Sequence, residues 1–408
     1  MNRKDFLIGC GAGLSLLATG PLRVFSAPFL PSEQDHILVL VFLRGGCDGL
    51  NLVGPSSDQV YQDARPAHLK VREKGERAGL RLQNGLGEVG FRLHPAAKEL
   101  KELYDQGDLA ILHACGLQNG TRSHFVAMDL IERGLQQRSG SAQGWMARYF
   151  AAVAAGGQLP AISGSGSLPV AMRGYGKAVS LSSPQDFNLM EVIRYPDLLR
   201  DWYRGAGAVD QAAQTTLDAI GLIQQEVQGG SRLDGGVGYP EEGLGNELSQ
   251  SLRTLASMIK LDLGLRIGQV DFGGWDTHEH QHYVFPELVR ALSQSLAAFY
   301  EDLSEYHERL TVLVMSEFGR RLRANKSEGT DHGYGNMMMV LGGQVQGGRM
   351  YGQWPGLRTE SLDKGVDLAI TTDYRSVLGE ILRERMDLGD VSAVFPNFNG
   401  YRRLGFLG

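Results

Sequence analysis

The sequence has few cysteines, few aromatic residues and no long basic run. Three of its 408 residues are Cys, and 8% are Phe, Trp or Tyr. Binding to nucleic acid usually requires clustered Lys and Arg to neutralise phosphates, often with aromatic residues between them. Beyond the first 27 residues, no apolar run is long enough to span a membrane. We therefore expect a mature protein with no nucleic-acid partner and no membrane span.

The first 27 residues differ from the rest of the chain. Arg3 and Lys4 precede an apolar run from Ile8 to Leu17, and the segment ends in Ser26-Ala27. A basic start, a short apolar run and small residues at the end are typical of a signal peptide. The order Arg-Lys-x-Phe-Leu resembles a twin-arginine leader, and a general secretion leader is the alternative. We expect the twin-arginine translocase to export the chain to the periplasm or the extracellular space, with residues 28–408 as the mature part.

Cleavage there would remove three basic side chains and one acidic side chain, so the formal charge would change from −6 to −8. It would also remove Cys10 and leave Cys47 and Cys115, each at the end of an apolar run. In an oxidising compartment these two form a disulfide if their strands are neighbours. Two buried free thiols are the alternative.

Four continuous apolar runs predict strands that are covered on both faces. These runs are His36–Leu43, Leu109–Ala114, Leu310–Ser316 and Met337–Leu341, and helical stretches at Pro95–Gln106 and Val284–Arg309 lie between them. With 55 glycines available for tight turns, this alternation predicts an α/β domain: a central, mostly parallel sheet with helices on both faces. Residues 135–245 are rich in Ala, Gly, Gln and Ser, and we expect them to form an insertion or cap at one edge of the sheet.

Polar clusters lie at the ends of these predicted strands, where ligands bind in open α/β sheets. The clusters are Arg44–Asn51, Thr121–Phe125, Gly273–His282, Ser316–Arg320 and Gly329–Gly333. They are rich in Asp, Glu, His and Ser. Their convergence on one edge predicts a single site, with side chains of the types that bind divalent metals.

Two of the clusters leave alternatives open. In the run from Asp276 to His282, potential ligands at every second position share one side of an extended segment. If the segment is helical instead, Asp276 and His280 meet at i and i+4. Ser123 precedes a helical run, so it is either an N-cap or a nucleophile, with Arg122 beside it to bind an anion.

Taken together, these motifs resemble a large bacterial family of exported, sulfatase-like proteins, catalogued as domain of unknown function 1501. The residues that carry the resemblance are Phe42–Asn51, Ser123–Phe125, Gly274–His278, Ser316–Arg320, Gly329–Gly333, Tyr351–Gly356 and Thr372–Arg375. The family is distantly similar to the alkaline phosphatase superfamily. The resemblance implies an alkaline phosphatase-like fold with a metal site at the strand ends.

The resemblance also assigns roles residue by residue. Ser123 matches the nucleophile. From its own chemistry, and not from the resemblance, the neighbouring Arg122 could hold the oxygens of the transferred group. The metal-binding positions match Asp48, Asp276, His278 or His280, Glu317 and His332. Asp331, beside His332, is a further candidate ligand by its residue type. Phe318 stands where a second His ligand is expected, which leaves a two-metal site incomplete. The ligand set fits zinc, manganese or calcium.

Three functions follow from these assignments. The first is a metal-dependent hydrolase of a phosphate or sulfate ester, acting on a small molecule or a polysaccharide. The second is a non-catalytic envelope protein with a degenerate site, for which Phe318 is the main argument. The third is a metal-free hydrolase in which Ser123 works with a distant His as its base.

Overall fold

A computed structural model describes residues 35–87, 89–118, 120–137, 142–153, 157–181, 196–228 and 236–408. The strands of its large sheet are β1 (Ile37–Leu43), β5 (Leu109–Gly116), β6 (Ala161–Ser163), β7 (Ala178–Ser180), β8 (Ile267–Phe272), β9 (Leu310–Ser316), β10 (Asn336–Leu341), β11 (Met350–Tyr351) and β12 (Thr372–Asp373). A small separate sheet contains β2 (Val53–Pro55), β3 (Leu80–Arg81) and β4 (Phe91–Leu93). The proposed leader, residues 1–27, lies outside the described residues.

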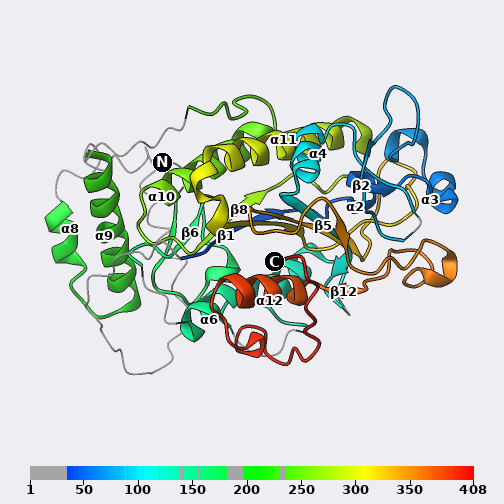
Figure 1. The fold of residues 1–408 in the computed structure, drawn as a ribbon. Helices are drawn as coiled ribbons and strands as arrows, with labels where there is room; N and C mark the ends of the chain where they lie inside the picture. Colours follow the sequence, from blue (N-terminus) through cyan, green and yellow to red (C-terminus); the bar gives the residue numbers. More distant parts are fainter. Residues whose placement is uncertain are drawn as a thin grey trace.

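Helices fill the connections between the strands (Figure 1). They are α2 (Gly49–Leu52), α3 (Gln59–Ala64), α4 (Lys98–Gln106), α5 (His124–Glu132), α6 (Trp145–Ala152), α8 (Pro196–Trp202), α9 (Ala208–Gln228), α10 (Gly245–Lys260), α11 (Gln281–Asp302) and α12 (Tyr374–Arg385). Among the described residues, no helix combines the length and the apolar character needed to cross a membrane.

The strand order of the large sheet is β11-β5-β10-β9-β1-β8-β6-β7, with β12 paired to β5. Only β10 runs antiparallel to its neighbours, β5 and β9. The other pairings, including those of β1 with β8 and β9, are parallel. All four predicted strands are present, so the prediction of a mostly parallel α/β sheet is confirmed.

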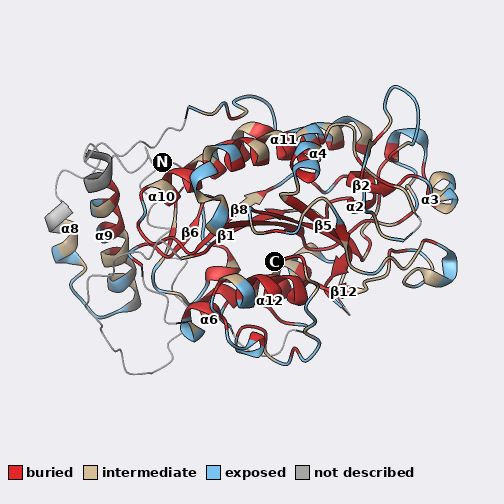
Figure 2. Ribbon diagram, viewed as in Figure 1, coloured by how far each residue is buried: buried red, intermediate tan, exposed pale blue. Residues whose placement is uncertain are grey.

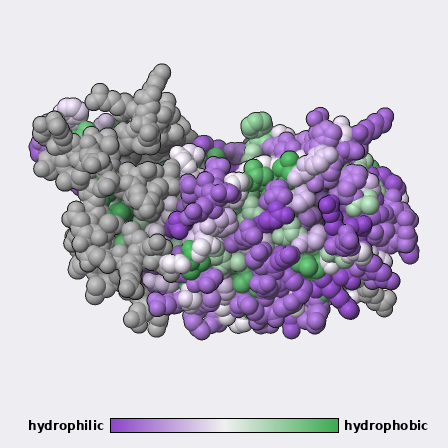
Figure 3. Space-filling view, turned by 90° about the horizontal axis from the view of Figure 1, so that it is seen from above, coloured by the Kyte–Doolittle hydropathy of each residue, from purple (hydrophilic) through white to green (hydrophobic). Residues whose placement is uncertain are grey.

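The sheet is covered on both faces, as the continuous apolar strands require. Successive side chains of β1 alternate between two cores: Val39 and Val41 pack in the core of α4, α10 and α11, and Leu40 and Phe42 in the core of α5, α6 and α12. Figure 1 shows α4, α10 and α11 on one side of the strands and α6 and α12 on the other, and Figure 2 shows the strands between them as buried. On the face seen in Figure 3, hydrophilic residues dominate the described surface, and hydrophobic residues lie scattered among them.

Of the two alternatives for Cys47 and Cys115, the structure has free thiols rather than a disulfide. Both residues are buried and free. Cys115 lies on β5 and Cys47 follows β1, and β10 and β9 stand between these two strands. Their strands are therefore not neighbours, which was the condition for the bond.

Candidate functional site

Four connections meet at one edge of the sheet. Because β1, β5, β8 and β9 all run in one direction, the loops that follow them leave the sheet at the same edge. The reversed strand β10 begins at that edge, so residues 317–335 between β9 and β10 stay there as well. These connections carry the polar clusters that the sequence marked.

Three imidazoles and one carboxylate gather between these loops. Nε2 of His332 lies 2.9 Å from Nε2 of His124 and 2.7 Å from Nε2 of His278. Oδ1 of Asp276 lies 3.4, 3.0 and 3.2 Å from Nε2 of His124, His278 and His332. Within the described chain, one set of three metal-type donors with all its ligand atoms within 4.8 Å of one another is His124, Asp276 and His332. His278 adjoins this set through His332 and Asp276. We call His124, Asp276, His278 and His332 the donor cluster.

The opposite nitrogen of each imidazole faces a fixed oxygen. Nδ1 of His124 lies 2.7 Å from Oε1 of Glu317, and Nδ1 of His332 lies 2.8 Å from the Arg122 carbonyl oxygen. Nδ1 of His278 lies 3.4 Å from Oδ1 of Asp331. An acceptor at Nδ1 favours the tautomer that carries its proton there. Each Nε2 lone pair is then directed into the donor cluster, as in metal-binding histidines that are held by a neighbouring carboxylate or carbonyl.

A buried arginine fixes the carboxylate of the cluster. Arg320 donates to Oδ1 of Asp276 over 2.6 Å, and its Nη1 lies 3.4 Å from Nε2 of His278. It also donates to the carbonyl oxygens of Gly45, Gly46, Trp275 and Thr330. Arg320 therefore holds together the loops that follow β1, β8 and β9.

These contacts separate the proton affinities of the groups. Partial burial favours the neutral acid of Asp276, but the hydrogen bond and charge of Arg320 outweigh it and lower the pKa to about 2. The hydrogen bond with Glu317 raises the pKa of His124, whereas burial lowers the pKa of His332. Burial opposes ionisation of Glu317, yet hydrogen bonds from His124, Gly45 and Ser316 lower its pKa. The carboxylates of the site are thus ionised at neutral pH.

The family described as a protein of unknown function, DUF1501, matches residues 110–393. The chain belongs to this family. The matched span includes the whole donor cluster, and the expected resemblance to DUF1501 is confirmed. No curated protein that was compared with the chain matches it.

In this DUF1501 chain, Phe318 closes one side of the donor cluster. Its buried ring lies 4.7 Å from the His124 ring and 4.9 Å from the His332 ring, centroid to centroid. Gly46, with φ of 66°, leaves room for it, since an added Cβ there would lie 2.5 Å from the Phe318 ring. Phe318 is therefore an apolar wall for two imidazoles at the position where a second His ligand was expected.

Asp48 is not part of the donor cluster. Its side chain is fully buried and forms a bidentate ion pair with Arg65, at 2.7 and 3.0 Å. Gln281 donates to the same carboxylate over 2.7 Å. The structure does not bring Asp48, predicted as a metal ligand, into the cluster, because its carboxylate pairs with the guanidinium of Arg65.

His280 is also outside the cluster. Asp276 and His278 do share one side of the segment, as an extended backbone predicts, but His280 has φ of 46° at the start of α11. This left-handed turn ends the alternation, and Nδ1 of His280 lies 3.3 Å from Glu328 at the surface. Of the two alternatives, the structure brings His278 rather than His280 to Asp276.

Glu317 and Asp331 were predicted as ligands, but the structure places them behind the imidazoles rather than among the donor atoms. Each lies next to the Nδ1 atom of an imidazole in the cluster, Glu317 beside His124 and Asp331 beside His278. Both therefore orient a donor residue. Asn325 donates to Asp331 and lowers its pKa.

Ser123 and Arg122 lie directly before α5, the helix that begins with His124. Ser123 is exposed, and its hydroxyl makes no capping bond to the helix. In the described part of the chain, the backbone N–H groups of Phe125 and Val126 have no acceptor either. The Arg122 guanidinium pairs with Asp367, so the part of Arg122 that contacts the cluster is its carbonyl oxygen.

His124 is the donor that sequence reasoning missed. It lies inside the Ser123–Phe125 motif, to which the sequence analysis assigned no metal ligand. Its signal was its position at the start of a helix after a buried strand, which directs it over the edge of the sheet.

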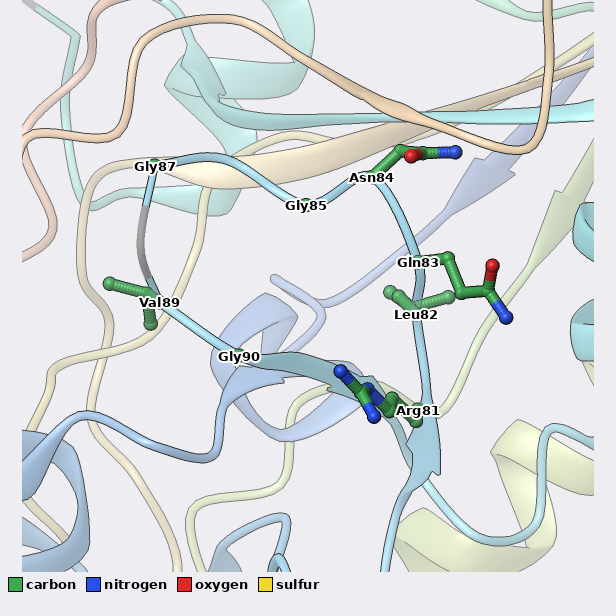
Figure 4. Close-up of a pocket in the computed structure, with 8 residues that line it drawn as sticks. All are labelled: Arg81, Leu82, Gln83, Asn84, Gly85, Gly87, Val89 and Gly90. Atoms are coloured by element: carbon green, nitrogen blue, oxygen red, sulfur yellow. The ribbon is translucent and has the colours of Figure 1, made fainter.

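A pocket of about 440 Å³ lies elsewhere, inside the loop from Arg81 to Gly90 (Figure 4). Its described lining includes Arg81, Gln83 and Asn84 and three glycines, and none of these residues belongs to the donor cluster. The described lining offers neither an acid–base pair nor metal-type donors, so we assign no chemistry to this pocket.

Proposed function

We propose that this chain is a metal-dependent hydrolase of phosphate or sulfate esters. The observation that carries the proposal is the donor cluster: the Nε2 atoms of His124, His278 and His332 and Oδ1 of Asp276, with neighbouring distances of 2.7–3.4 Å. Lone pairs directed at one another repel unless a cation or a proton lies between them. A divalent cation would relieve this repulsion.

The donor set fits such an ion. Ligands of tetrahedral zinc lie about 2.0–2.1 Å from the metal, which puts them roughly 3.3 Å from one another. The five distances given above, which join His332 and Asp276 to each other and to the other two donors, are 2.7–3.4 Å and close to this value. Three imidazoles and one carboxylate suit zinc or manganese better than calcium, which prefers oxygen ligands. When bound, the ion would supply Lewis-acid stabilisation of charge on an ester oxygen.

The residues around the cluster support an anionic substrate. The exposed hydroxyl of Ser123 adjoins His124 and is the nucleophile of the proposal. The free N–H groups of Phe125 and Val126 begin α5, and a helix start with unbonded N–H groups favours an oxyanion. Arg320 and Glu317 would keep the donors in place during the reaction.

The fold and cellular location are part of the same proposal. A mostly parallel sheet with this cluster at its carboxyl edge supports an alkaline phosphatase-like or sulfatase-like fold. We further propose export by the twin-arginine translocase. Replacing Arg3 and Lys4 by Gln should leave the precursor in the cytoplasm; export that continues without the twin-arginine translocase would exclude this route.

Metal content and ester hydrolysis test the proposal together. The purified protein should contain about one divalent ion per chain and hydrolyse members of a panel of phosphate and sulfate esters. Asp276→Ala should lose both the ion and the activity, whereas Ser123→Ala should keep the ion and lose the activity. His280→Ala, outside the cluster, is the matched control and should change neither.

A non-catalytic role is the second candidate. It is favoured by the internal ion pairs that occupy Arg122 and Asp48, two residues expected to serve the site. A protein that binds the ion but hydrolyses no ester in the panel would support this role. A protein that binds no ion after dialysis against zinc or manganese would exclude the metal-dependent enzyme.

A further inference from the structure

Arg122 connects the donor cluster to a buried carboxylate far along the chain. Its carbonyl oxygen accepts a hydrogen bond from Nδ1 of His332 at 2.8 Å. Its guanidinium donates to Oδ2 of Asp367, a residue 245 positions later. The two contacts are made by opposite ends of one residue, so the position of its backbone depends on what holds its side chain.

Asp367 is well suited to hold it. Its side chain has no exposed surface, and Oδ1 has no hydrogen-bond partner among the described residues. The next cationic atom, Nε of Arg321, lies 4.0 Å from Oδ1. An ionised carboxylate that is buried requires a close partner, and Arg122 supplies the nearest positive charge.

The segment around Asp367 is itself fixed against the loop of His332. Leu322 donates its N–H to the Val366 carbonyl, and Gly335 donates to the Leu368 carbonyl. Asp367 also forms an isolated bridge with Arg321, next to the bridge between Arg320 and His332. The carboxylate therefore has a defined position relative to His332.

We propose that Asp367 is a positioning residue of the donor cluster and acts through Arg122 and His332. By holding the Arg122 side chain, Asp367 keeps the Arg122 carbonyl where it accepts the Nδ1 proton of His332. The Nε2 lone pair of His332 is then directed toward Asp276 and the other imidazoles. This inference rests on the proposed function only where it assigns the cluster to a metal; the effect on the His332 tautomer does not depend on a metal.

Asp367→Asn tests the relay, with Asp363→Asn as the matched control. Asp363 is a second carboxylate near Arg122, but its Oδ2 lies 4.0 Å away and its side chain is 32% exposed. Zn²⁺ affinity would be measured by competition with a chelating indicator. We expect Asp367→Asn to weaken binding about 10–100-fold, as loss of such outer partners does, and Asp363→Asn to change it less than about twofold.

Arg122→Gln gives a second route, because it keeps the backbone carbonyl and removes the ion pair. If the pair acts as a unit, the double variant Asp367→Asn/Arg122→Gln should bind Zn²⁺ about as weakly as either single variant. A Zn²⁺ affinity in Asp367→Asn equal to that of the control, even with a lower unfolding temperature, would mean that Asp367 is structural only and overturn the proposal.

The ¹⁵N shifts of His332 in metal-free protein at mildly alkaline pH supply a readout that needs no metal. The wild type should show the Nδ1-protonated tautomer, and Asp367→Asn and Arg122→Gln should show a mixture. If the wild type binds no Zn²⁺, the metal-dependent function fails while this measurement still tests the relay. An unchanged tautomer in both variants would overturn the relay.

Discussion

The Arg320 guanidinium donates to Oδ1 of Asp276 over 2.6 Å, although the arginine side chain is completely buried and the aspartate side chain is half exposed. The positive charge of the buried Arg320 is thus balanced by the carboxylate of Asp276 at the rim of the site. The same guanidinium satisfies four carbonyl oxygens of the surrounding loops. Arg320 therefore both holds the loops that carry the donors and supplies the charge that lowers the pKa of Asp276.

Arg320→Lys should therefore destabilise the protein. A lysine cannot reproduce the fork of the guanidinium, so buried carbonyls would lose their donors. We expect the free energy of unfolding in urea to fall by about 3 kcal/mol. Arg321→Lys is the control: its side chain is 43% exposed, and it should change stability by less than about 0.5 kcal/mol. Equal effects of the two changes would contradict this role for Arg320.

His124→Ala should weaken Zn²⁺ binding more than tenfold, because it removes one of the converging Nε2 atoms. His280→Ala should leave the affinity unchanged, since its ring faces Glu328 at the surface. Isothermal titration of metal-free protein with Zn²⁺ would compare the two. A larger loss in His280→Ala would restore the alternative ligand that the sequence left open.

Phe125→Ala should weaken the binding of aryl esters without changing metal content. Phe125 is 83% exposed and directly follows His124 at the start of α5, so its ring is available to a substrate bound at the cluster. Loss of an aromatic contact of roughly 0.5–1.5 kcal/mol would raise KM about two- to tenfold and leave kcat unchanged. Trp202→Ala, another exposed aromatic on α8, should have no effect on KM. An unchanged KM for Phe125→Ala would rule out this contact.

Acid should destabilise the fold through His113. This residue is fully buried on β5, its Nε2 bonded to the Val53 carbonyl and its Nδ1 accepting from the Ala114 N–H. Burial lowers its pKa from 6.5 to about 4. Below pH 6.5, His113 is therefore protonated in the unfolded chain but stays neutral in the folded chain. The contribution of His113 to stability is complete above pH 6.5 and is lost as the pH falls toward 4. The contribution of His113 to this loss is about 3 kcal/mol.

His113→Gln removes that titration. In urea unfolding curves between pH 6.5 and 4, the variant should lose less stability than the wild type by about the same 3 kcal/mol. His36 and His94, whose pKa values burial also lowers to about 4, would account for an acid loss that remains. An identical pH dependence in variant and wild type would show that His113 is not the sensor.

Glu380 should anchor the end of the described chain. Its carboxylate is fully buried and accepts from the backbone N–H groups of Leu404, Gly405, Phe406 and Leu407. Glu380→Gln exchanges two acceptor oxygens for one, and we expect a loss of about 2 kcal/mol and faster proteolysis near residue 404. Glu384→Gln, on the same helix α12 but partly exposed, should change neither.

The main strands could be predicted because parallel strands buried on both faces are continuous apolar runs, as in Ile37–Leu43 and Leu310–Ser316. Strand β8 was missed because Gly268, Gln269 and Asp271 interrupt its apolar pattern. Its polar residues belong to a partly buried network: Gln269 donates to Asp271, and Arg44 donates to Asp271 as well. Asp271 is compensated by Arg44, which follows a different strand, and the local sequence around β8 gives no sign of this long-range pairing.

Within the site, local rules predicted the neighbourhood but not the role of each residue. Asp48 lies directly after β1, as predicted, but Arg65 neutralises it, and nothing near Asp48 in the sequence indicates that pairing. The alternation from Asp276 to His282 held for Asp276 and His278 and stopped at the left-handed turn of His280. In both cases tertiary contacts decide whether a ligand-type side chain reaches the cluster.

The spread of the donors along the chain limits how this site can be separated from the rest of the protein. Donors that lie side by side, His124 and His332, are 208 residues apart in the chain. The shortest continuous fragment that contains every donor lacks β1, which pairs with β8 and β9 in the middle of the sheet. No excised peptide or single exchanged loop can therefore reproduce the centre. Transplanting the site into another protein would require the whole sheet. A chain split into two complementing fragments would keep all donors on one fragment only if the cut fell outside residues 124–332.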